Sequence, residues 1–185
     1  MNKKDINPVK LLNYYKLINH NLIYNNKAIN RYKKDNFELS DDKTKNLDLL
    51  RTAILNQKNC DLKKQAKNIV FSDGNPKSKI MLVGEAPGAS EDQEGLPFVG
   101  RAGMLLDKML AAINLDRKKV YISNIINYRP PENRRPTDAE IEKYLPFITK
   151  HIEIIEPKIL VLRGSTAMNA IIGKDLVISK MRGKW

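Results

Sequence analysis

The sequence predicts an α/β fold in which a short parallel sheet lies between layers of helices. Three short apolar runs rich in β-branched residues carry this prediction: KIMLV (79–83), VYISNI (120–125) and KILVLR (158–163). Such runs are typical of strands that are buried on both faces. Helical patterns separate them, and this alternation indicates right-handed crossovers in a parallel sheet. We therefore expect a three-layer α/β/α domain.

Each segment between the strands has the apolar periodicity of a helix. The first pattern covers residues 102–114, and the second begins at Thr137, where Glu140 completes a capping box. A shorter helix is predicted to follow Ser165 and to end near Gly173. In open α/β sheets, function is found at the carboxyl ends of the strands. The loops that follow the three strands are therefore the first place to look for a site.

Residues 1–56 differ from the rest, and we expect a helical and linker extension ahead of a main domain at 57–185. Residues 25–46 are polar and charged, which is typical of a linker, and residues 47–57 resume a helical pattern. Apolar side chains at helical spacing predict an earlier amphipathic helix: Leu11, Leu12, Tyr15, Ile18 and Leu22.

The composition makes nucleic acid the first partner to consider. The chain has 33 Lys and Arg against 21 Asp and Glu, a net charge of +12, and such an excess attracts phosphate backbones. Alternatively, the abundance of Lys, Asn and Ile reflects an AT-rich genome, and the charge follows from that. The single cysteine, Cys60, fits a reducing cytoplasm. Because no stretch approaches the roughly 20 apolar residues of a membrane span, we expect a cytoplasmic protein without membrane contact.

The most unusual stretch is the Gly-rich loop VGEAPGASEDQEGLPFVGRAG (83–103) after the first strand. A loop of this kind can cradle a nucleotide, but this one lacks the Lys-Ser/Thr of a P-loop and the glycine spacing of a dinucleotide fold. Its carboxylates, beginning with Glu85, would repel phosphate. The loop is therefore not expected to hold a triphosphate.

Motifs in the last two-thirds of the chain resemble the family 4 uracil-DNA glycosylases, iron–sulfur enzymes that remove uracil from DNA. The segments that carry the resemblance are VFSDGNPKSKIMLVGEAPGASEDQEGLPFVGRAGMLL, VYISNIINYRPPENRRPTDAEI, PKILVLRGSTAMNAIIG and ISKMRGKW. The resemblance covers about 57–185 and implies the glycosylase-like three-layer fold. It also implies hydrolysis of the N-glycosidic bond of uracil in DNA, the first step of base excision repair.

The resemblance implies a uracil pocket around the Gly-rich loop. Gly84, Glu85 and Ala86 would contact the base, Phe98 would stack on it, and Asn124 would read its edge. A held carboxamide donates to O4 and accepts from N3–H of uracil, the reverse of what cytosine presents. Glu85 and Asn124 would be the catalytic residues, with the carboxylate positioning water or offsetting the positive charge of the sugar. From the residues alone, Phe98 packing in the core and Asn124 turning the chain remain alternatives.

Arginines near these motifs would contact the DNA backbone and give salt-dependent affinity. They are Arg101, Arg129, Arg134 and Arg135. For each of them, a solvated surface side chain is the alternative.

The chain departs from the family at the [4Fe–4S] cluster, which four cysteines hold. The corresponding positions are Gln57, Cys60, Tyr128 and Tyr144, so one thiol remains. A cubane cluster needs thiolates. We therefore expect no cluster, no other cofactor and no metal, with Tyr128 and Tyr144 packed in the vacated volume.

A second departure is that the family continues beyond Trp185 into a further strand and a His-Pro motif, whose histidine donates to uracil O2. Neither His20 nor His151 aligns with it. We therefore expect a sheet without its C-terminal edge strand and a chain of doubtful activity. Three hypotheses follow: a truncated glycosylase, a non-catalytic remnant that still binds uracil-containing DNA, and an unrelated protein that binds a small acidic ligand or a partner. The oligomeric state is not predicted.

Overall fold

The computed structural model describes residues 42–58, 60–173, 177–181 and 183. The amphipathic helix predicted between Leu11 and Leu22 lies outside the described residues.

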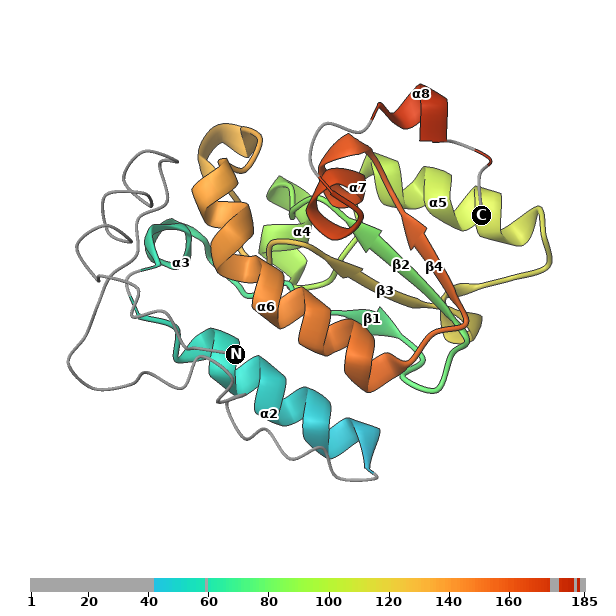
Figure 1. Cartoon of the computed structure of the whole chain (residues 1–185), viewed down its shortest axis with the longest axis horizontal. Coiled ribbons are helices and arrows are strands. Elements are labelled where there is room, and N and C mark those ends of the chain that lie inside the picture. Colours follow the sequence, from blue (N-terminus) through green and yellow to red (C-terminus); the bar gives the residue numbers. More distant parts are fainter. Residues whose placement is uncertain (1–41, 59, 174–176, 182, 184–185) are drawn as a thin grey trace, which may run out of the picture. The chain divides into compact units, whose positions relative to one another are not determined.

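Four strands form one sheet in the order β1-β3-β2-β4 (Figure 1). Strands β2 (Ile80–Gly84), β3 (Tyr121–Asn124) and β4 (Ile159–Leu162) run parallel, which confirms the three predicted strands. The two-residue β1 (Asp73–Gly74) pairs antiparallel with β3. Strand β1 was not predicted, because neither of its residues is apolar.

Helices cover the strands and connect them. Their bounds are α2 Lys43–Leu55, α3 Asp61–Gln65, α4 Ala89–Glu94, α5 Arg101–Ala111, α6 Asp138–Ile155, α7 Ser165–Ile171 and α8 Ile178–Met181, with 3-10 turns η1 Arg117–Lys119 and η2 Pro131–Asn133. The capping box of α6 is confirmed, because Glu140 N donates to Thr137 Oγ1 at 3.3 Å and Thr137 N donates to Glu140 Oε2 at 2.7 Å. No described helix combines the length and the apolar character that crossing a lipid bilayer demands.

Helix α2 begins earlier than the sequence predicted. Residues 43–46 were assigned to a linker, and this was wrong, because Asp42 caps the helix by accepting a 2.9 Å hydrogen bond from Thr44 N. The apolar residues Leu47, Leu50 and Ile54 of α2 are buried, and α2 contacts α6. The polar first turn hid the start of the helix from a periodicity argument.

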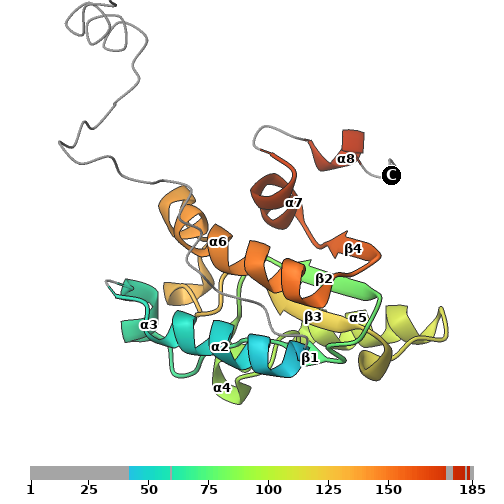
Figure 2. The same cartoon turned by 60° about the horizontal axis from the view of Figure 1, so that its bottom comes forward.

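The two faces of the sheet are covered by different helices, which confirms the three-layer prediction. Leu82 and Ile122 pack with Leu106 of α5 on one face. Tyr121, the neighbour of Ile122 and therefore on the other face, has its hydroxyl 2.7 Å from His151 Nε2 of α6. Figures 1 and 2 show α6 and α5 on opposite sides of the strands.

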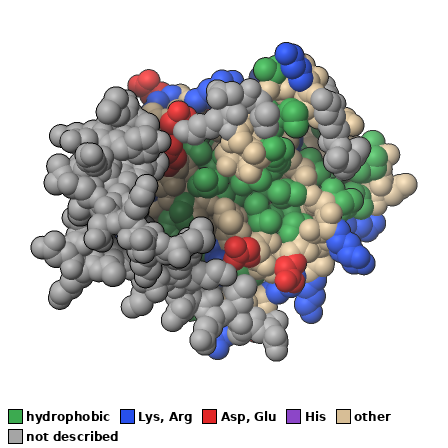
Figure 3. Space-filling view, viewed as in Figure 1, with side chains coloured by type: hydrophobic (Ala, Val, Ile, Leu, Met, Phe, Trp, Pro, Cys, Tyr) green, Lys and Arg blue, Asp and Glu red, His purple; other side chains and the backbone are tan. Residues whose placement is uncertain are grey.

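Strand β4 is the outer strand of the described sheet on the side away from β1. Its side chains Ile159 and Val161 are 42% and 39% exposed. Figure 3 shows hydrophobic side chains gathered at the centre of this face, with Lys and Arg mainly towards its rim. On the face in this view, Lys and Arg side chains therefore lie mainly outside an apolar area.

Candidate active site

Three of the sequence-predicted pocket residues meet at the carboxyl edge of the sheet. Gly84 and Asn124 are register partners at the ends of β2 and β3. A Cβ atom on Gly84 would lie 2.4 Å from Asn124 Oδ1 and 2.5 Å from Phe98 Cζ. Only glycine leaves room for the amide and the ring to approach the backbone here. Two strands and the Gly-rich loop therefore build one corner from Gly84, Phe98 and Asn124.

The backbone around Phe98 is held in an uncommon conformation. Phe98 has φ 57°, in the left-handed region that few non-glycine residues adopt. Arg117 donates from Nη2 to the Phe98 carbonyl and from Nη1 to the Pro97 carbonyl at 3.1 Å. Gly103 lies so close that a Cβ there would be 1.6 Å from the Phe98 carbonyl oxygen. These contacts therefore hold the backbone from which the Phe98 ring projects.

Arg117 is itself anchored by two carboxylates. Its Nη1 lies 2.8 Å from Asp73 Oδ2, and its Nε lies 2.8 Å from Asp107 Oδ1. Partial burial opposes its charge, but Asp107 and Asp73 outweigh this effect and raise the pKa of Arg117. The guanidinium therefore links β1, α5 and the Phe98 loop. Sequence reasoning missed Arg117, because no local pattern marks it.

Glu85, the residue after β2, is held by α7. Thr166 Oγ1 donates a hydrogen bond to Glu85 Oε2 at 2.5 Å. The backbone pairing of the sheet also continues past the strand end, because Ile126 N donates to the Glu85 carbonyl at 3.1 Å. Ala86 follows in the same segment and is partly buried. The carboxylate is thus oriented at the carboxyl edge, directly after the last residue of β2.

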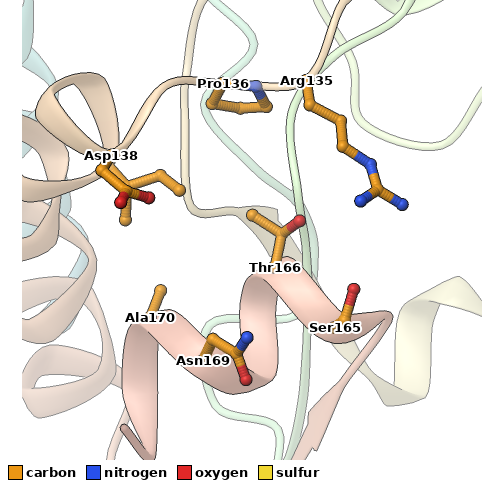
Figure 4. Close-up of a pocket in the computed structure, with 8 residues that line it drawn as sticks. Arg135, Pro136, Asp138, Ser165, Thr166, Asn169 and Ala170 are labelled. Carbon is orange, nitrogen blue, oxygen red and sulfur yellow. The ribbon is translucent and has the colours of Figure 1, made fainter. Parts of the chain in front are cut away.

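A cleft of about 240 Å³ is lined by Thr166, the hydrogen-bond partner of this carboxylate. Figure 4 shows its walls, in which Arg135 and Pro136 face Ser165 and Thr166 of α7. Thr166 lines the cleft and also binds Glu85. Thr166 is therefore the residue through which the cleft between α6 and α7 is connected to Glu85.

The predicted DNA-contacting arginines occupy different environments. Arg101 is exposed at the first residue of α5, and Arg129 Nε donates to Asn133 Oδ1 at 2.7 Å. Arg134 makes two hydrogen bonds to Glu140, of 2.8 and 2.7 Å. This pairing lowers the pKa of Glu140 to about 2. The guanidinium of Arg134 is therefore already engaged by a carboxylate.

Polar atoms are buried at the four positions that correspond to the cluster ligands, which are Gln57, Cys60, Tyr128 and Tyr144. Cys60 Sγ lies 3.1 Å from the Tyr144 hydroxyl. Gln57 Oε1 and the Tyr128 hydroxyl are buried without a hydrogen-bond partner in the described part of the chain. Burial raises the pKa of Tyr128 and of Tyr144, and Cys60 raises both further. These donors do not suit an iron–sulfur cluster, because one thiol and two neutral phenols replace the thiolates.

Sequence reasoning also missed a role for Arg163. The strand pattern located the carboxyl end of β4, where Arg163 stands, but no function was predicted for this residue. Its guanidinium carbon lies 4.7 Å from the centre of the Phe98 ring. A basic residue at the end of a parallel strand was the available signal.

Comparison with known proteins identifies the family to which the chain belongs. Residues 71–185 match the family described as the Uracil DNA glycosylase superfamily. The chain therefore belongs to the uracil DNA glycosylase superfamily.

Within that class, the chain is similar to curated proteins named type-4 uracil-DNA glycosylase. It is 44% identical to the one from Archaeoglobus fulgidus over 75% of this chain and 71% of the relative. It is 44% identical to the one from Thermotoga maritima over 67% of this chain and 65% of the relative. It is 42% identical to the one from Sulfurisphaera tokodaii over 75% of this chain and 65% of the relative. The resemblance read from the motifs is thereby confirmed, and no comparison favours the remnant or the unrelated binding protein.

Proposed function

We propose that this chain is a uracil-DNA glycosylase, which hydrolyses the N-glycosidic bond between uracil and deoxyribose in DNA. The observation that carries the proposal is the corner built by Gly84, Phe98 and Asn124 at the carboxyl edge of the sheet. Membership of the superfamily and the names of the relatives support it. On this basis uracil-containing DNA is the substrate, and the reaction opens base excision repair.

Recognition of uracil follows from the chemistry of the corner. The Phe98 ring offers a face on which a flipped base stacks, and the Asn124 carboxamide offers one donor and one acceptor to its edge. Uracil presents the O4 acceptor and the N3–H donor that match this pair, whereas cytosine presents the reverse. Because Asn124 is 2% exposed, the orientation of its side chain is restricted, and a mismatched base would leave buried polar atoms unpaired.

Hydrolysis requires a group that acts on the sugar side. We assign this role to Glu85, whose carboxylate would position the attacking water or offset positive charge on the sugar. The hydrogen bond from Thr166 supports the assignment, because it holds the carboxylate at the strand end. Gly84 and Ala86 would contact the base through their backbone.

Binding of the DNA backbone would involve Arg101, Arg129 and Arg134, with Arg135 at the cleft. The exposure of Arg101 and the position of Arg135 beside Thr166 support this role. Arg134 would have to exchange or share its pairing with Glu140. Each phosphate contact would make the affinity fall with rising salt.

We propose that the reaction takes place in residues 57–185, which contain all of these side chains, and that it needs no iron–sulfur cluster or metal. Hydrogen bonding of the one thiol to Tyr144 supports this proposal, and no group of three or more His, Cys, Asp or Glu among the described residues could hold a metal ion. We also propose a cytoplasmic location, which a free cysteine suits.

The glycosylase proposal is tested by incubating the chain with a uracil-containing oligonucleotide and cleaving abasic sites with alkali. Wild type is expected to produce strand breaks at uracil, with Asn124→Ala and Phe98→Ala at least about 10²-fold slower. Gln93→Ala, at an exposed amide in α4, and Met109→Ala, at a 56% exposed side chain of α5, serve as controls with unchanged rates. Wild-type protein that binds uracil-containing DNA but produces no abasic site would contradict the proposal.

The proposal that no cluster is needed has its own test. Anaerobically purified wild type is expected to contain no stoichiometric iron and sulfide. The triple variant Gln57→Cys, Tyr128→Cys, Tyr144→Cys restores four thiols and is expected to acquire both on reconstitution, since thiolates are the ligands that such a cluster requires. Stoichiometric cluster in the wild type would overturn this part of the account.

A further inference from the structure

Arg163 flanks the candidate pocket from the side opposite to Asn124. Strand β2 lies between β3 and β4, and the register pairs Gly84 with Asn124 on one side and Val83 with Leu162 on the other. Arg163 N continues this pairing with a 2.8 Å hydrogen bond to the Val83 carbonyl. Asn124, Gly84 and Arg163 therefore follow one another across the carboxyl ends of three adjacent strands.

The guanidinium of Arg163 covers the aromatic ring of this pocket. Its Cζ atom lies 4.7 Å from the centre of the Phe98 ring, within the range of a cation–π contact. An edge of the same ring faces Gly84, and the ring also packs against the core of β2 and α5. Arg163 thus lies over a face of the Phe98 ring, the kind of surface on which a flipped base would stack.

One end of this guanidinium lacks a partner. Arg163 Nη1 is buried and makes no hydrogen bond within the part of the chain that the structure describes. A buried donor without an acceptor is costly, and donors are seldom left in this state unless a ligand supplies the acceptor. Burial also lowers the pKa of Arg163, although an arginine remains protonated at neutral pH. The site therefore holds a positive charge that is partly shielded from solvent, with Nη1 buried.

We propose that Arg163 is a catalytic residue of the base pocket, where it donates a hydrogen bond to a carbonyl oxygen of the flipped base and stabilises the anion in which that base departs. The inference rests on the proposed glycosylase function. As the base stacks on Phe98, the guanidinium moves from the ring face to the rim of the base, and Nη1 gains its missing acceptor.

The electron balance assigns Arg163 an electrostatic role only. The bond between C1′ and N1 breaks, and its electron pair stays on N1 and spreads onto the uracil oxygens. Water forms the new bond to C1′, and the proton that this water loses balances the one that the uracil anion later takes up from solvent. Arg163 keeps its proton throughout, and its charge lies closest to the group on which negative charge develops.

The decisive experiment compares leaving groups in single-turnover excision. Arg163→Leu is expected to release uracil about 10²–10³-fold more slowly than wild type. On 5-fluorouracil, whose anion is more stable, the loss is expected to be at least tenfold smaller, because less stabilisation is needed. Arg163→Lys keeps the charge without the planar guanidinium, and we expect it to release uracil at a rate between those of wild type and Arg163→Leu. Lys158→Leu, an exposed cation on the chain segment leading into β4, is the control and is expected to match wild type.

Two results would overturn the inference: an unchanged rate in Arg163→Leu, or an equal loss on both bases. A merely structural role predicts that Arg163→Leu lowers the unfolding midpoint, whereas the unpaired Nη1 predicts a midpoint as high as that of wild type or higher.

A second measurement separates this inference from the glycosylase proposal: the affinity for free 5-fluorouracil at pH values above and below the pKa of that base. Wild type is expected to prefer the anion by about tenfold, as a charge-assisted hydrogen bond would give, and Arg163→Leu is expected to show no preference. A wild type that binds the anion in this way but excises nothing would contradict the proposed function alone. Equal binding of both forms by wild type would contradict the role of Arg163.

Discussion

Thr166 holds the carboxylate of Glu85 through a 2.5 Å hydrogen bond from Oγ1 to Oε2. This length is typical of a hydroxyl that donates to an ionised carboxylate. Since Thr166 belongs to α7 and Glu85 follows β2, the bond ties a helix after the last described strand to the loop of the candidate site.

Thr166→Val keeps the shape of the side chain and removes the donor. We expect excision of uracil to slow by about 10- to 100-fold, which corresponds to the loss of one charge-assisted hydrogen bond of about 1.5–3 kcal/mol. Thr166→Ser keeps the hydroxyl and should retain most of the rate. Equal rates for the valine and serine variants in single-turnover assays would show that the bond does not serve catalysis.

Arg117 is predicted to position Phe98. Arg117→Leu removes the donors to the Pro97 and Phe98 carbonyls and leaves Asp73 and Asp107 without their cation. We expect a loss of unfolding free energy of about 2 kcal/mol and weaker binding of free uracil, measured by competition well below the unfolding midpoint. Lys118→Leu, at the exposed neighbouring residue, should change neither quantity. Unchanged uracil affinity in folded Arg117→Leu would limit Arg117 to a stabilising role.

Tyr128 and Tyr144 should respond in opposite ways to loss of their hydroxyls. Tyr144→Phe removes the contact with Cys60 Sγ and is expected to destabilise the fold by about 1 kcal/mol. Tyr128→Phe removes a buried hydroxyl that has no partner among the described residues, so it should leave the fold equally stable or make it more stable. Denaturant unfolding of the two variants against wild type measures both effects. A larger loss for Tyr128→Phe would imply a partner for that hydroxyl.

His151 should make stability depend on pH. It is 1% exposed, stacks on Phe71 and lies against Tyr121, and its burial lowers its pKa from 6.5 to about 3. The unfolded chain therefore binds a proton below pH 6.5 that the folded chain excludes. The contribution of neutral His151 to the free energy of unfolding is fully present above pH 6.5. It is lost as pH falls towards 3, at up to about 1.4 kcal/mol per pH unit.

The measurement for this prediction is urea unfolding at several pH values between about 6.5 and 5.5, above the ordinary pKa of 4.5 at which Glu140 takes up a proton in the unfolded chain. His151→Phe keeps an aromatic ring beside Phe71 and removes the titrating group. Its stability should vary less with pH across this window than that of wild type. Parallel profiles for the two proteins would show that His151 is not the responsible group.

The strands and most helices could be predicted because their signals are local. Apolar runs located β2, β3 and β4, and the capping box located the start of α6. Strand β1 and the first turn of α2 escaped because their residues are polar or charged, and only the backbone pairing and the Asp42 cap identify them.

The site was predictable to the extent that its residues stand at strand ends or in the Gly-rich loop. Gly84 and Asn124 end adjacent parallel strands, so topology alone brings them together. Arg117 and Thr166 act through contacts between segments distant in sequence, 19 and 81 residues from their partners Phe98 and Glu85. No sequence pattern records contacts of that kind. Arg163 had a visible position, but its place over Phe98 depends on the conformation of the loop.

The central claim is that the corner of Gly84, Phe98 and Asn124 receives uracil, and the most direct measurement is excision of uracil and of cytosine from the same oligonucleotide by wild type and Asn124→Asp. Wild type should release uracil and leave cytosine. The carboxylate cannot donate to uracil O4, so Asn124→Asp should release uracil at least about 10²-fold more slowly and reduce the preference for uracil over cytosine. Equal rates and an unchanged preference in the two proteins would contradict the account, because Asn124 would then not read the base.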